Sequence, residues 1–433
     1  MTAFLGMRGT GDWATDQRPK NWREGILKEF PNGDVPITAI NSRGASEATD
    51  DPEFNWWSKS LELQGGNLFS GANSTGNVFS DSGLSSAYTD AATAISVGTV
   101  VYAKCAEATA SHFRVGHTAL LIDRSDNSQT IFGKVVGVNL NGATSSIAVK
   151  VRVATTYAVA FDCDYIDIVG SSNPEGGVIP DSVTYDPTKY LNYTQIFRTP
   201  LDITRTARKT RLRTGDAYAE MKREAMLYHG VEMEMAVLFG EKSEVTGDNG
   251  KPERTSQGGI SFVTENASDN VQDFVTSTGN TWLQAGEDWL DEQIELLFRH
   301  GGSERLGYCG SGALLGIQRL VKGNSNFTFT PETAAYGIKV MRWTTPFGDL
   351  LLKRHPLFSY KDHRTNDVFI HDPANLKFRY IDDTTFRKDP NENKAGFQAI
   401  DGCKEEFLTE GGWEWHFPNT MMYLRGVGLD GTA

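Results

Sequence analysis

Cysteine is scarce in this chain, and no cysteine lies in a spacing typical of a disulfide framework or a metal site. Cys105, Cys163, Cys309 and Cys403 lie far apart, with no Cys-x-x-Cys pair and no nearby series of histidines. This pattern predicts reduced and mostly buried thiols, as in a protein that folds in the cytoplasm. It does not support a zinc site, and we predict neither a metal nor another cofactor.

Long apolar runs and an excess of positive charge are absent as well. The N-terminal segment lacks the charged and apolar regions of a signal sequence, and no window approaches the length of a membrane span. The 42 basic residues are outnumbered by 55 acidic ones, which gives a net charge of −13. Such a balance argues against a surface that binds nucleic acid over its whole area, because phosphate binding needs local positive charge.

What the chain does contain is typical of a folded protein rich in β-structure. Its 433 residues are 39% apolar and 22% charged, which is ordinary for a protein that buries a substantial core. Strands do not alternate with helices in the first half, which disfavours a parallel dinucleotide-binding sheet. Between 50 and 178, short strand patterns recur at fairly regular spacing, and they read GTVVYAKC, HTALLIDR, TIFGKVVGV, SSIAVKVRV and YIDIVG.

The clearest single element is an extended segment from Tyr193 that leads into one long helix, predicted at 214–243. A helix of this kind has one buried face, and the pattern indicates a scaffold element, not an active site. Its apolar residues recur in steps of three and four, which places them on one stripe of the helix: Tyr218, Met221, Ala225, Tyr228, Val231, Met235 and Leu238.

The remainder of the chain mixes helices and strands. Further helices are predicted at 281–300 and 312–322, and the intervening GDNGKPERTSQGG is predicted as a polar turn or loop. Strand patterns then follow in AAYGIKVMRW, GDLLLKRH, DVFIHD and NLKFRYID. Near the C-terminus, three aromatic residues alternate as they would along a strand: Trp413, Trp415 and Phe417.

No constellation of residues predicts catalysis. The glycines of GSGALLG (310–316) are spaced one residue away from a dinucleotide fingerprint, but no strong parallel strand is predicted before them. A loop that enters a helix is therefore favoured. His355, His363 and His371 are spaced too widely for zinc ligands, and we expect them at the surface or in turns. Adjacent acid pairs point to opposite faces of a strand and form no acid–base site, so we predict that the chain is not an enzyme.

One electrostatic feature rises above its surroundings, and we call it the basic strip. It has no acid and contains five basic residues, Arg205, Arg208, Lys209, Arg211 and Arg213. A solvated or acid-paired face is favoured over contact with a polyanion. No aromatic residues are interleaved with the cations, so base stacking is not indicated. The sequence leaves open that the strip contacts other subunits or lies near nucleic acid.

The first 48 residues are polar and broken by glycine, with one short helical candidate at 18–30. A segment with so few apolar residues has little core of its own. It nevertheless contains Trp13 and Trp22, and large aromatic residues in such a segment typically dock on another surface. We expect these two tryptophans to anchor the segment on this subunit or on a neighbour.

Several segments follow one another in a characteristic order. They are the polar RPKNWREGILKEFPNGDVPITAI, a β-rich stretch ending in NYTQIFRTPLDITRTARKT, the helix DAYAEMKREAMLYHGVEMEMAVLFGEKSE and the turn NGKPERTSQGGI. TPFGDLLLKRHPLF, VFIHDPANLKFRYIDDTTF and GCKEEFLTEGGWEWHFPNTMMYLRGV complete the series. This order resembles that of the major capsid proteins of tailed double-stranded DNA phages, which have the Hong Kong 97-type fold. The resemblance covers nearly the whole chain, best from residue 191 onward.

The resemblance implies an α+β fold of the Hong Kong 97 type in which each part has a role. Such a fold has a long spine helix, peripheral and axial domains, and an extended β-loop, here enlarged by a small β-rich insertion. The implied parts are an N-terminal arm (1–48), the extended loop with its insertion (49–190), the peripheral domain (191–280) with the spine helix (214–243), the axial domain (281–395) and C-terminal strands that return to the peripheral domain (396–433).

The function implied by the resemblance is that of a structural subunit. It would self-assemble into the icosahedral head that encloses double-stranded phage DNA. Its partners would be further copies in hexamers and pentamers, a separate scaffolding protein, a portal and a decoration protein, with the packaged double-stranded DNA in non-specific proximity. Lysines fall in the extended-loop region, but nothing assigns an asparagine or a catalytic glutamate to them, so no cross-link is predicted: Lys59, Lys104, Lys134 and Lys150.

Two other interpretations stay open at this stage. One is the shell of a cellular nanocompartment with the same fold, which would enclose an enzyme cargo. The large β-rich insertion and the arm favour the phage head over this shell. The other is a β-rich carbohydrate-binding or hydrolytic protein that uses exposed tryptophans, which would be a monomer with a deep cleft. The absence of a carboxylate pair in a recognisable loop counts against it.

Overall fold

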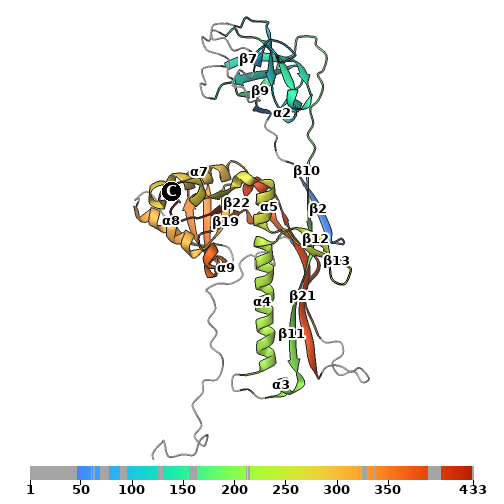
Figure 1. Cartoon of the computed structure of the whole chain (residues 1–433), viewed down its shortest axis with the longest axis vertical. Coiled ribbons are helices and arrows are strands. Elements are labelled where there is room, and N and C mark those ends of the chain that lie inside the picture. Colours follow the sequence, from blue (N-terminus) through green and yellow to red (C-terminus); the bar gives the residue numbers. More distant parts are fainter. Residues whose placement is uncertain are drawn as a thin grey trace, which may run out of the picture. The chain divides into compact units, whose positions relative to one another are not determined.

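The chain divides into two compact units in the computed structural model (Figure 1). One is Lys59–Thr188, and the other combines the described parts of Met1–Ser58 and Lys189–Ala433. Trp13, Trp22 and the helix predicted at 18–30 lie outside the described residues. The structure describes residues 46–59, 61, 64–68, 78–87, 95–124, 130–155, 163–210, 212, 215–323, 329–334, 338–388 and 401–431.

The unit Lys59–Thr188 is built on an antiparallel sheet with the strand order β3-β9-β6-β7-β8-β5-β4. Side chains alternate between buried and less buried positions along its strands, as in a sheet with one face on a core. The strands predicted here are confirmed. Its elements are β3 (Gly65–Asn67), β4 (Val78–Phe79), β5 (Val100–Lys104), α2 (Glu107–Ser111), β6 (His117–Ile122), β7 (Thr130–Asn139), η1 (Gly142–Thr144), β8 (Ser146–Val151) and β9 (Tyr165–Ser171).

The second unit contains a sheet with the strand order β1-β20-β21-β11. Its long antiparallel ladder between β11 and β21 extends from the pair Gln195–Gly411 to the pair Thr204–Gly402. Every second side chain of β11 is buried, so the strand turns one face toward a helix. The four strands are β1 (Ser46–Ala48), β11 (Gln195–Thr204), β20 (Leu376–Arg387) and β21 (Gly402–Trp415).

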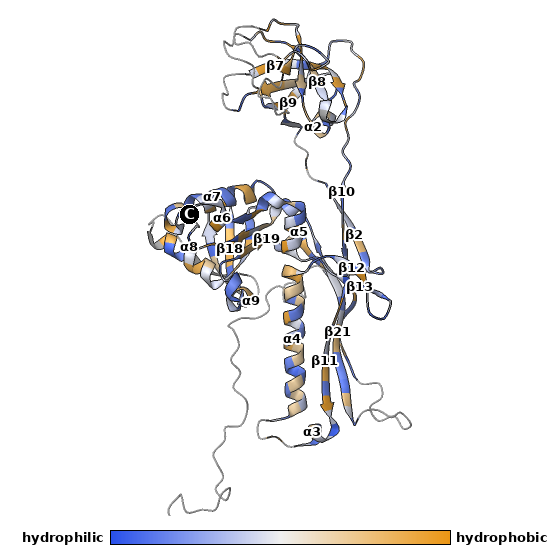
Figure 2. Ribbon diagram, viewed as in Figure 1, coloured by the Kyte–Doolittle hydropathy of each residue, from blue (hydrophilic) through white to orange (hydrophobic). Residues whose placement is uncertain are grey.

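The long helix α4 (Ala217–Phe239) packs against β11 and β21, inside the range predicted from the sequence. The Asp216 side chain accepts a hydrogen bond from the Tyr218 amide and begins the helix. The buried stripe differs from the predicted one. His229 is buried, while Tyr228 is 54% exposed, because the sheet lies on the side of α4 that carries Ala225 and His229. Hydrophobic and hydrophilic residues are interspersed along α4 (Figure 2).

A second sheet in this unit is mixed, with the strand order β14-β22-β19-β15-β18-β17-β16. The helices α7 and α8 pack on it and confirm the predictions at 281–300 and 312–322. A capping box between Thr281 and Gln284 begins α7. The elements are β14 (Val271–Asp273), α7 (Trp282–Phe298), β15 (Glu304–Cys309), α8 (Ser311–Gly323), β16 (Phe329–Ala334), β17 (Ile338–Thr344), β18 (Asp349–Arg354), β19 (Val368–His371) and β22 (Met422–Arg425).

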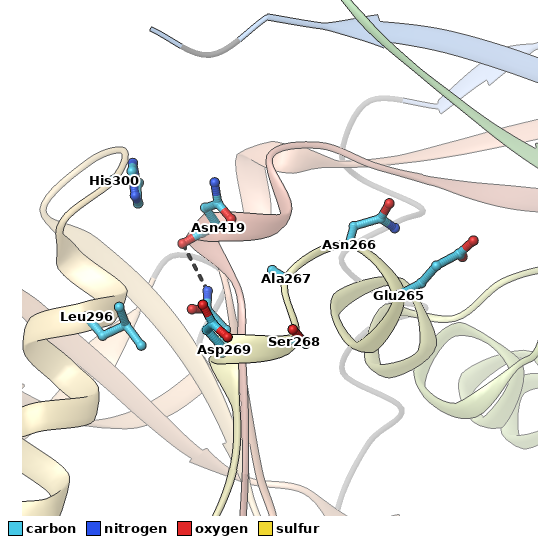
Figure 3. A pocket seen from close by; sticks show the side chains of 9 residues that line it. Glu265, Asn266, Ala267, Ser268, Asp269, Leu296, His300 and Asn419 are labelled. Atoms are coloured by element: carbon cyan, nitrogen blue, oxygen red, sulfur yellow. Dashed lines mark hydrogen bonds between the residues drawn. The ribbon is translucent and has the colours of Figure 1, made fainter. Parts of the chain in front are cut away.

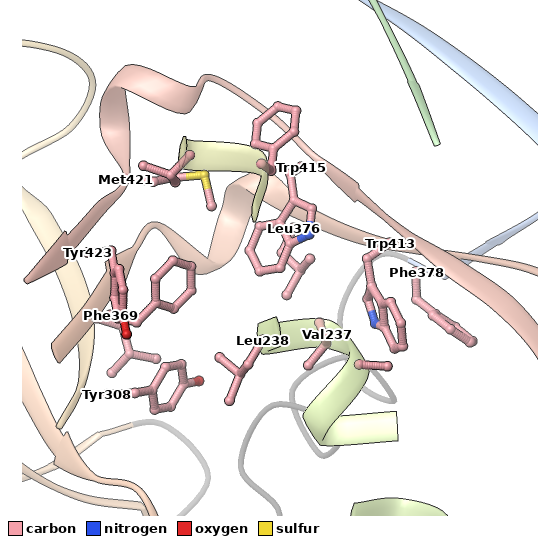
Figure 4. Close-up of a cluster of buried hydrophobic side chains, with 14 of the residues drawn as sticks. Val237, Leu238, Tyr308, Phe369, Leu376, Phe378, Trp413, Trp415, Met421 and Tyr423 are labelled. Carbon is pink, nitrogen blue, oxygen red and sulfur yellow. The ribbon is translucent and has the colours of Figure 1, made fainter. Parts of the chain in front are cut away.

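One hydrophobic core joins the two sheets of this unit at the C-terminal end of α4 (Figure 4). Val237 and Leu238 of α4 meet Trp413 and Trp415 of β21, and Tyr308 of β15 belongs to the same cluster. Full burial of such large side chains stabilises a fold by about 1.5–3 kcal/mol each. The helix therefore holds both sheets, and a smaller cluster secures its other end against the long sheet.

Short elements complete the unit. The structure differs from the sequence-based prediction at β13 and at the end of β21. The segment predicted as a polar turn or loop does begin with a turn, but Pro252–Thr255 then forms β13, which pairs with β12 in a hairpin. Phe417 does not continue the strand: β21 ends at Trp415, and Phe417 has a positive φ of 54°. The remaining elements are β2 (Glu53–Ser58) paired with β10 (Thr188–Tyr193), α3 (Arg205–Lys209), β12 (Ser243–Thr246), β13 (Pro252–Thr255), α5 (Gly259–Asn266), η2 (Ser268–Asn270), α6 (Phe274–Ser277), α9 (Pro356–Tyr360), η4 (Asp362–Arg364), η5 (Pro373–Asn375) and η6 (Pro418–Thr420).

The C-terminal part of the chain is shared between the two sheets, in contrast to the predicted boundary at residue 395. The strand β20 falls within the predicted range 281–395, yet it pairs with β21 in the long sheet. The strand β22 falls within 396–433, yet it pairs with β19 and β14 in the mixed sheet. Strand pairing, which joins residues far apart in the chain, sets this division, and no composition change marks it.

Candidate assembly interface

A chain of hydrogen bonds crosses the layer between α4 and the long sheet. Thr384 and Thr409 are joined at 2.8 Å, and Thr409 Oγ1 lies 2.7 Å from Nε2 of His229. On the other side of the ring, Nδ1 lies 2.9 Å from Thr199 Oγ1, which donates to Glu232. Since Thr199 donates its own proton, a neutral His229 with its hydrogen on Nδ1 completes the chain. Burial lowers the pKa of His229, against a smaller opposing effect of Glu232, and favours this neutral form.

The C-terminal half of α4 is joined to the mixed sheet by a buried polar contact. Nε2 of His355 lies 2.6 Å from Oε1 of Glu234, and both side chains are fully buried. The Leu357 amide donates to Nδ1 of the same ring, so the hydrogen of His355 is on Nε2 and points to the carboxylate. His355 thus caps α9 and holds α4 at the same time. The expectation of a surface or turn histidine was wrong for His355 and also for His371, because both lie inside cores formed by distant segments.

Two residues of the basic strip, Arg205 and Arg208, contact other residues of the same chain. The exposed Arg205 pairs with Asp401 at 2.6 Å. The guanidinium of Arg208 lies 4.7 Å from the centre of the Tyr218 ring, whose hydroxyl donates to Glu405. Burial, and then this bond to Glu405, raises the pKa of Tyr218 to about 12. These contacts agree with an acid-paired face, as the sequence analysis favours.

Of the other three residues of the basic strip, only Lys209 is among the described residues. Lys209 is exposed at the end of α3. Arg211 and Arg213 lie outside the described residues. The strip therefore has exposed cations at one end of the long sheet, beside the start of α4. Whether these groups meet another subunit or the packaged genome stays a prediction.

The short strand β1 adds to one edge of the long sheet. It pairs in parallel with Phe378–Tyr380 of β20, and Glu47 lies 3.3 Å from Lys377 and forms an ion pair with Arg379. Arg379 in turn donates to Glu414 of β21 at 2.6 Å. The opposite edge of the sheet is β11, with which no further strand of the described residues pairs in this sheet. An unpaired strand edge is a surface that can accept a strand of another chain.

Several large apolar side chains of the described residues are exposed. Val178 and Ile179 are 93% and 91% exposed in a segment without helix or strand. On α4, Met226, Leu227 and Tyr228 form an exposed apolar turn on the side away from the sheet. Contiguous exposed apolar residues mark surfaces that bind other molecules. The apolar spacing of α4 does not indicate this exposed turn, because it places Tyr228 in the buried stripe.

The glycine-rich segment 310–316 enters a helix, as predicted, but a parallel strand precedes it, which the sequence does not predict. The strand β15 does precede it, and β15 pairs in parallel with β18. The glycines nevertheless serve packing. A Cβ on Gly310 would lie 2.2 Å from the carbonyl oxygen of Thr365, and that oxygen accepts from the Ala313 amide at 2.9 Å. The protein backbone thus occupies the place that a phosphate would need at the start of α8.

In the described part of the chain, the cysteines and the other potential metal ligands do not form a metal site. All four cysteines are buried and form no disulfide, as predicted. Burial raises the pKa of Cys105 to about 12, which makes it an unreactive thiol. No group of three or more His, Cys, Asp and Glu residues among those described is close enough to hold a metal ion. No helix of the described residues is long and apolar enough to cross a membrane.

Two hollows of the second unit are lined mainly by polar and acidic residues. One lies between the end of α5, η2 and the end of α7, where Asp269, Leu296, His300 and Asn419 surround it (Figure 3). A second and wider groove follows α7 and shares Asp269 and Leu296 with the first. Neither resembles the deep, mostly apolar pocket of a small-molecule site. Open edges, exposed apolar turns and charged grooves are instead the features of a subunit that binds other protein chains, the class to which structural shell proteins belong.

The comparisons with known proteins assign the family within that class. The model of the SU10 major capsid protein family matches residues 7–428, and the chain belongs to this family. A major capsid protein of Pseudomonas phage PaMx41 is 24% identical over 404 residues, which are 92% of this chain and 88% of that protein. The predicted function, a structural subunit of the icosahedral phage head, is confirmed, and the described residues form the α+β architecture that the sequence predicts.

Solved structures of shell proteins also match the chain at low identity. The capsid of the native GTA particle is 9% identical with a TM-score of 0.41, and the match covers 96% of each chain. The SrpI encapsulin from Synechococcus elongatus PCC 7942 is 11% identical with a TM-score of 0.38, and the match covers 57% of this chain and 77% of that one.

Proposed function

We propose that the chain builds the phage head as hexamers and pentamers, with a division of labour between its parts. The long sheet and α4 would form the peripheral domain, and the mixed sheet with α7 and α8 the axial domain around the five-fold and six-fold axes. The observation that supports this proposal is the single core at the end of α4, which holds both sheets in one body. A subunit held from several sides in a closed shell needs such a body to transmit its contacts.

The other parts would reach neighbouring subunits. We assign residues 1–48 to an N-terminal arm, which is supported by the pairing of β1 with the edge of β20. We assign 49–190 to the extended loop, within which Lys59–Thr188 is a compact insertion. The entering strand β2 pairs with the leaving strand β10, as expected where a domain is inserted into a loop.

The remaining partners follow from the same function. We propose that a separate scaffolding protein guides assembly, that a portal occupies one vertex and that a decoration protein adds to the outside. The packaged double-stranded DNA would lie near the chain without specific contacts, consistent with the net charge of −13. The subunit would be synthesised in the host cytoplasm, and it would have no catalytic activity and no cofactor.

Electron microscopy of the purified protein tests the proposal. We expect closed shells with six-fold and five-fold capsomers, either from the chain alone or after a scaffolding protein is added. Size-exclusion chromatography with light scattering then measures the size of the species in solution. A strictly monomeric protein under both conditions, or rings and tubes without five-fold vertices, would contradict the proposed assembly.

A further inference from the structure

The groove along α7 is lined by more charged residues than the hollow between α5, η2 and the end of α7. Its volume is roughly 1010 Å³, and it lies between α7, η2 and the turn that joins β17 to β18. One cation, Arg299, lines it against five carboxylates, Asp269, Asp288, Asp291, Glu292 and Glu295. We call this surface the acidic groove. The shell function explains the fold around it but assigns no role to its charge.

Contacts within the chain neutralise only part of this charge. Arg299 donates to both carboxylate oxygens of Glu295, at 2.8 and 2.7 Å. Asp288 and Glu292 are four residues apart on the exposed side of α7, and Asp291 and Glu295 repeat the spacing. Like charges at this spacing destabilise a helix. Burial, and then the neighbouring Asp288, raises the pKa of Asp291, as expected for an acid that lacks a cation.

Two further residues indicate the kind of group that the acidic groove receives. Gln293 also lines the groove and is 9% exposed, and its Oε1 has no hydrogen-bond partner in the structure. A buried amide oxygen without a donor is unfavourable and calls for one. Phe347, from the turn between β17 and β18, is 47% exposed at the same groove. Carboxylates, a free carbonyl oxygen and an aromatic face together suit the ammonium or guanidinium group of a basic side chain.

A metal ion does not suit the acidic groove. Calcium and magnesium need several oxygen ligands around one point. None of the described acidic residues are grouped closely enough to provide them. The carboxylates follow one another along the helix instead, at positions 288, 291, 292 and 295, so they present a ridge of charge. A ridge matches a protein surface that carries several cations.

We propose that the acidic groove docks lysine and arginine side chains of a second copy of this chain. The proposal rests on the shell function, because a subunit of a closed shell is surrounded by its own copies. Each copy carries 42 basic residues, so a neighbour can supply the cations. A head-to-tail contact, in which the groove of one copy meets a different surface of the next, closes into a ring as a capsomer requires. Charged contacts of this kind guide orientation and depend on salt.

A double variant, Asp288→Asn with Glu292→Gln, tests the inference because it removes two charges and keeps the side-chain shapes. In the unassembled subunit the variant should melt at the same temperature as the natural chain or slightly above it, since repulsion along α7 is relieved. Assembly should nevertheless fall several-fold, measured as sedimenting particles under conditions in which the natural chain assembles. Its dependence on salt between 50 and 500 mM should also become flatter.

The matched control is Asp248→Asn with Glu253→Gln, which changes the net charge equally on the exposed hairpin of β12 and β13. We expect it to assemble as the natural chain does. The inference is wrong if the groove variant assembles with natural yield and salt dependence, or if the control loses as much. It is also wrong if the loss occurs only when another head protein is present, since the groove then binds that partner. Failure of the natural chain to form any shell would instead contradict the proposed function.

Discussion

Nε2 of His355 donates to Oε1 of Glu234 across 2.6 Å, and this buried bond joins α4 to the end of β18. It lies beside the core that holds the two sheets of the second unit together, since the His355 ring contacts Tyr308 and Phe358 of that core. A buried carboxylate adds little net stability while it is hydrogen-bonded, but loss of its partner leaves the charge unpaired in the core and costs much. The pair therefore makes the relative placement of the two sheets sensitive to single substitutions.

The first prediction concerns this pair. His355→Leu leaves a buried carboxylate without its imidazole and should lower the free energy of unfolding by about 3–5 kcal/mol. Glu234→Gln keeps an oxygen that accepts from Nε2, so its loss should be closer to 1 kcal/mol. Urea unfolding of the dissociated subunit measures both values. Losses of equal size in the two variants would show that the carboxylate charge has no part in the effect.

The second prediction concerns pH. His371 is fully buried between the rings of Tyr308 and Phe369, and burial lowers its pKa to about 4, only partly offset by Asp372. The unfolded chain takes up this proton below about pH 6.5, before the folded chain does. Stability should therefore fall as the pH decreases from 6.5 to 4, by roughly 3 kcal/mol for this group. His371→Phe removes the group and should flatten the curve over that range, whereas an unchanged slope would refute the assignment.

The third prediction compares two aromatic residues close together in sequence. Trp415 is 1% exposed in the core at the end of α4, and Phe417 is 45% exposed just beyond the strand. Trp415→Ala should cost about 3–5 kcal/mol, because it removes contacts and leaves a cavity. Phe417→Ala should cost less than about 1 kcal/mol in the isolated subunit. Thermal or urea unfolding measures both, and similar losses would contradict the described end of β21.

The fourth prediction concerns the compact insertion. The unit Lys59–Thr188 has its own antiparallel sheet and its own hydrophobic cluster. Replacement of residues 61–186 by a short glycine–serine linker should leave a folded remainder with little change in its melting temperature, because β2 and β10 already lie side by side. The excised segment should unfold cooperatively by itself. Loss of near-ultraviolet circular dichroism in either piece would show that the two units depend on each other.

The fifth prediction concerns the basic strip. Reversal of Arg208 and Arg211 to glutamate should reduce assembly or packaging if the strip meets neighbours or faces the lumen. The far-ultraviolet circular dichroism of the subunit should not change, because both residues lie outside α4. Lys251→Glu with Lys388→Glu makes the same change in net charge elsewhere and serves as the control. A normal particle yield from the strip variant would contradict a role of the basic strip in assembly or packaging.

Local periodicity made much of the fold predictable. The alternation of β11 and the caps and apolar spacing of α7 depend on residues within one element, so they can be read directly. The same holds for the strands of the insertion. The candidate interface could be predicted from the sequence only in part. Four carboxylates of the acidic groove lie in one stretch of α7, but nothing in that stretch indicates that η2 and the turn before β18 complete the groove.

The sequence by itself determined the types of most elements and predicted the buried thiols, and its segment order sufficed to indicate the capsid family. Only the tertiary structure decided that His229, not Tyr228, faces the sheet, and that His355 and His371 are buried. It also decided that β20 and β22 join different sheets. The physical reason is the same in each case. Which face of an element is buried, and which strand it pairs with, depends on the distant segment packed against it, and local spacing carries no information about that segment.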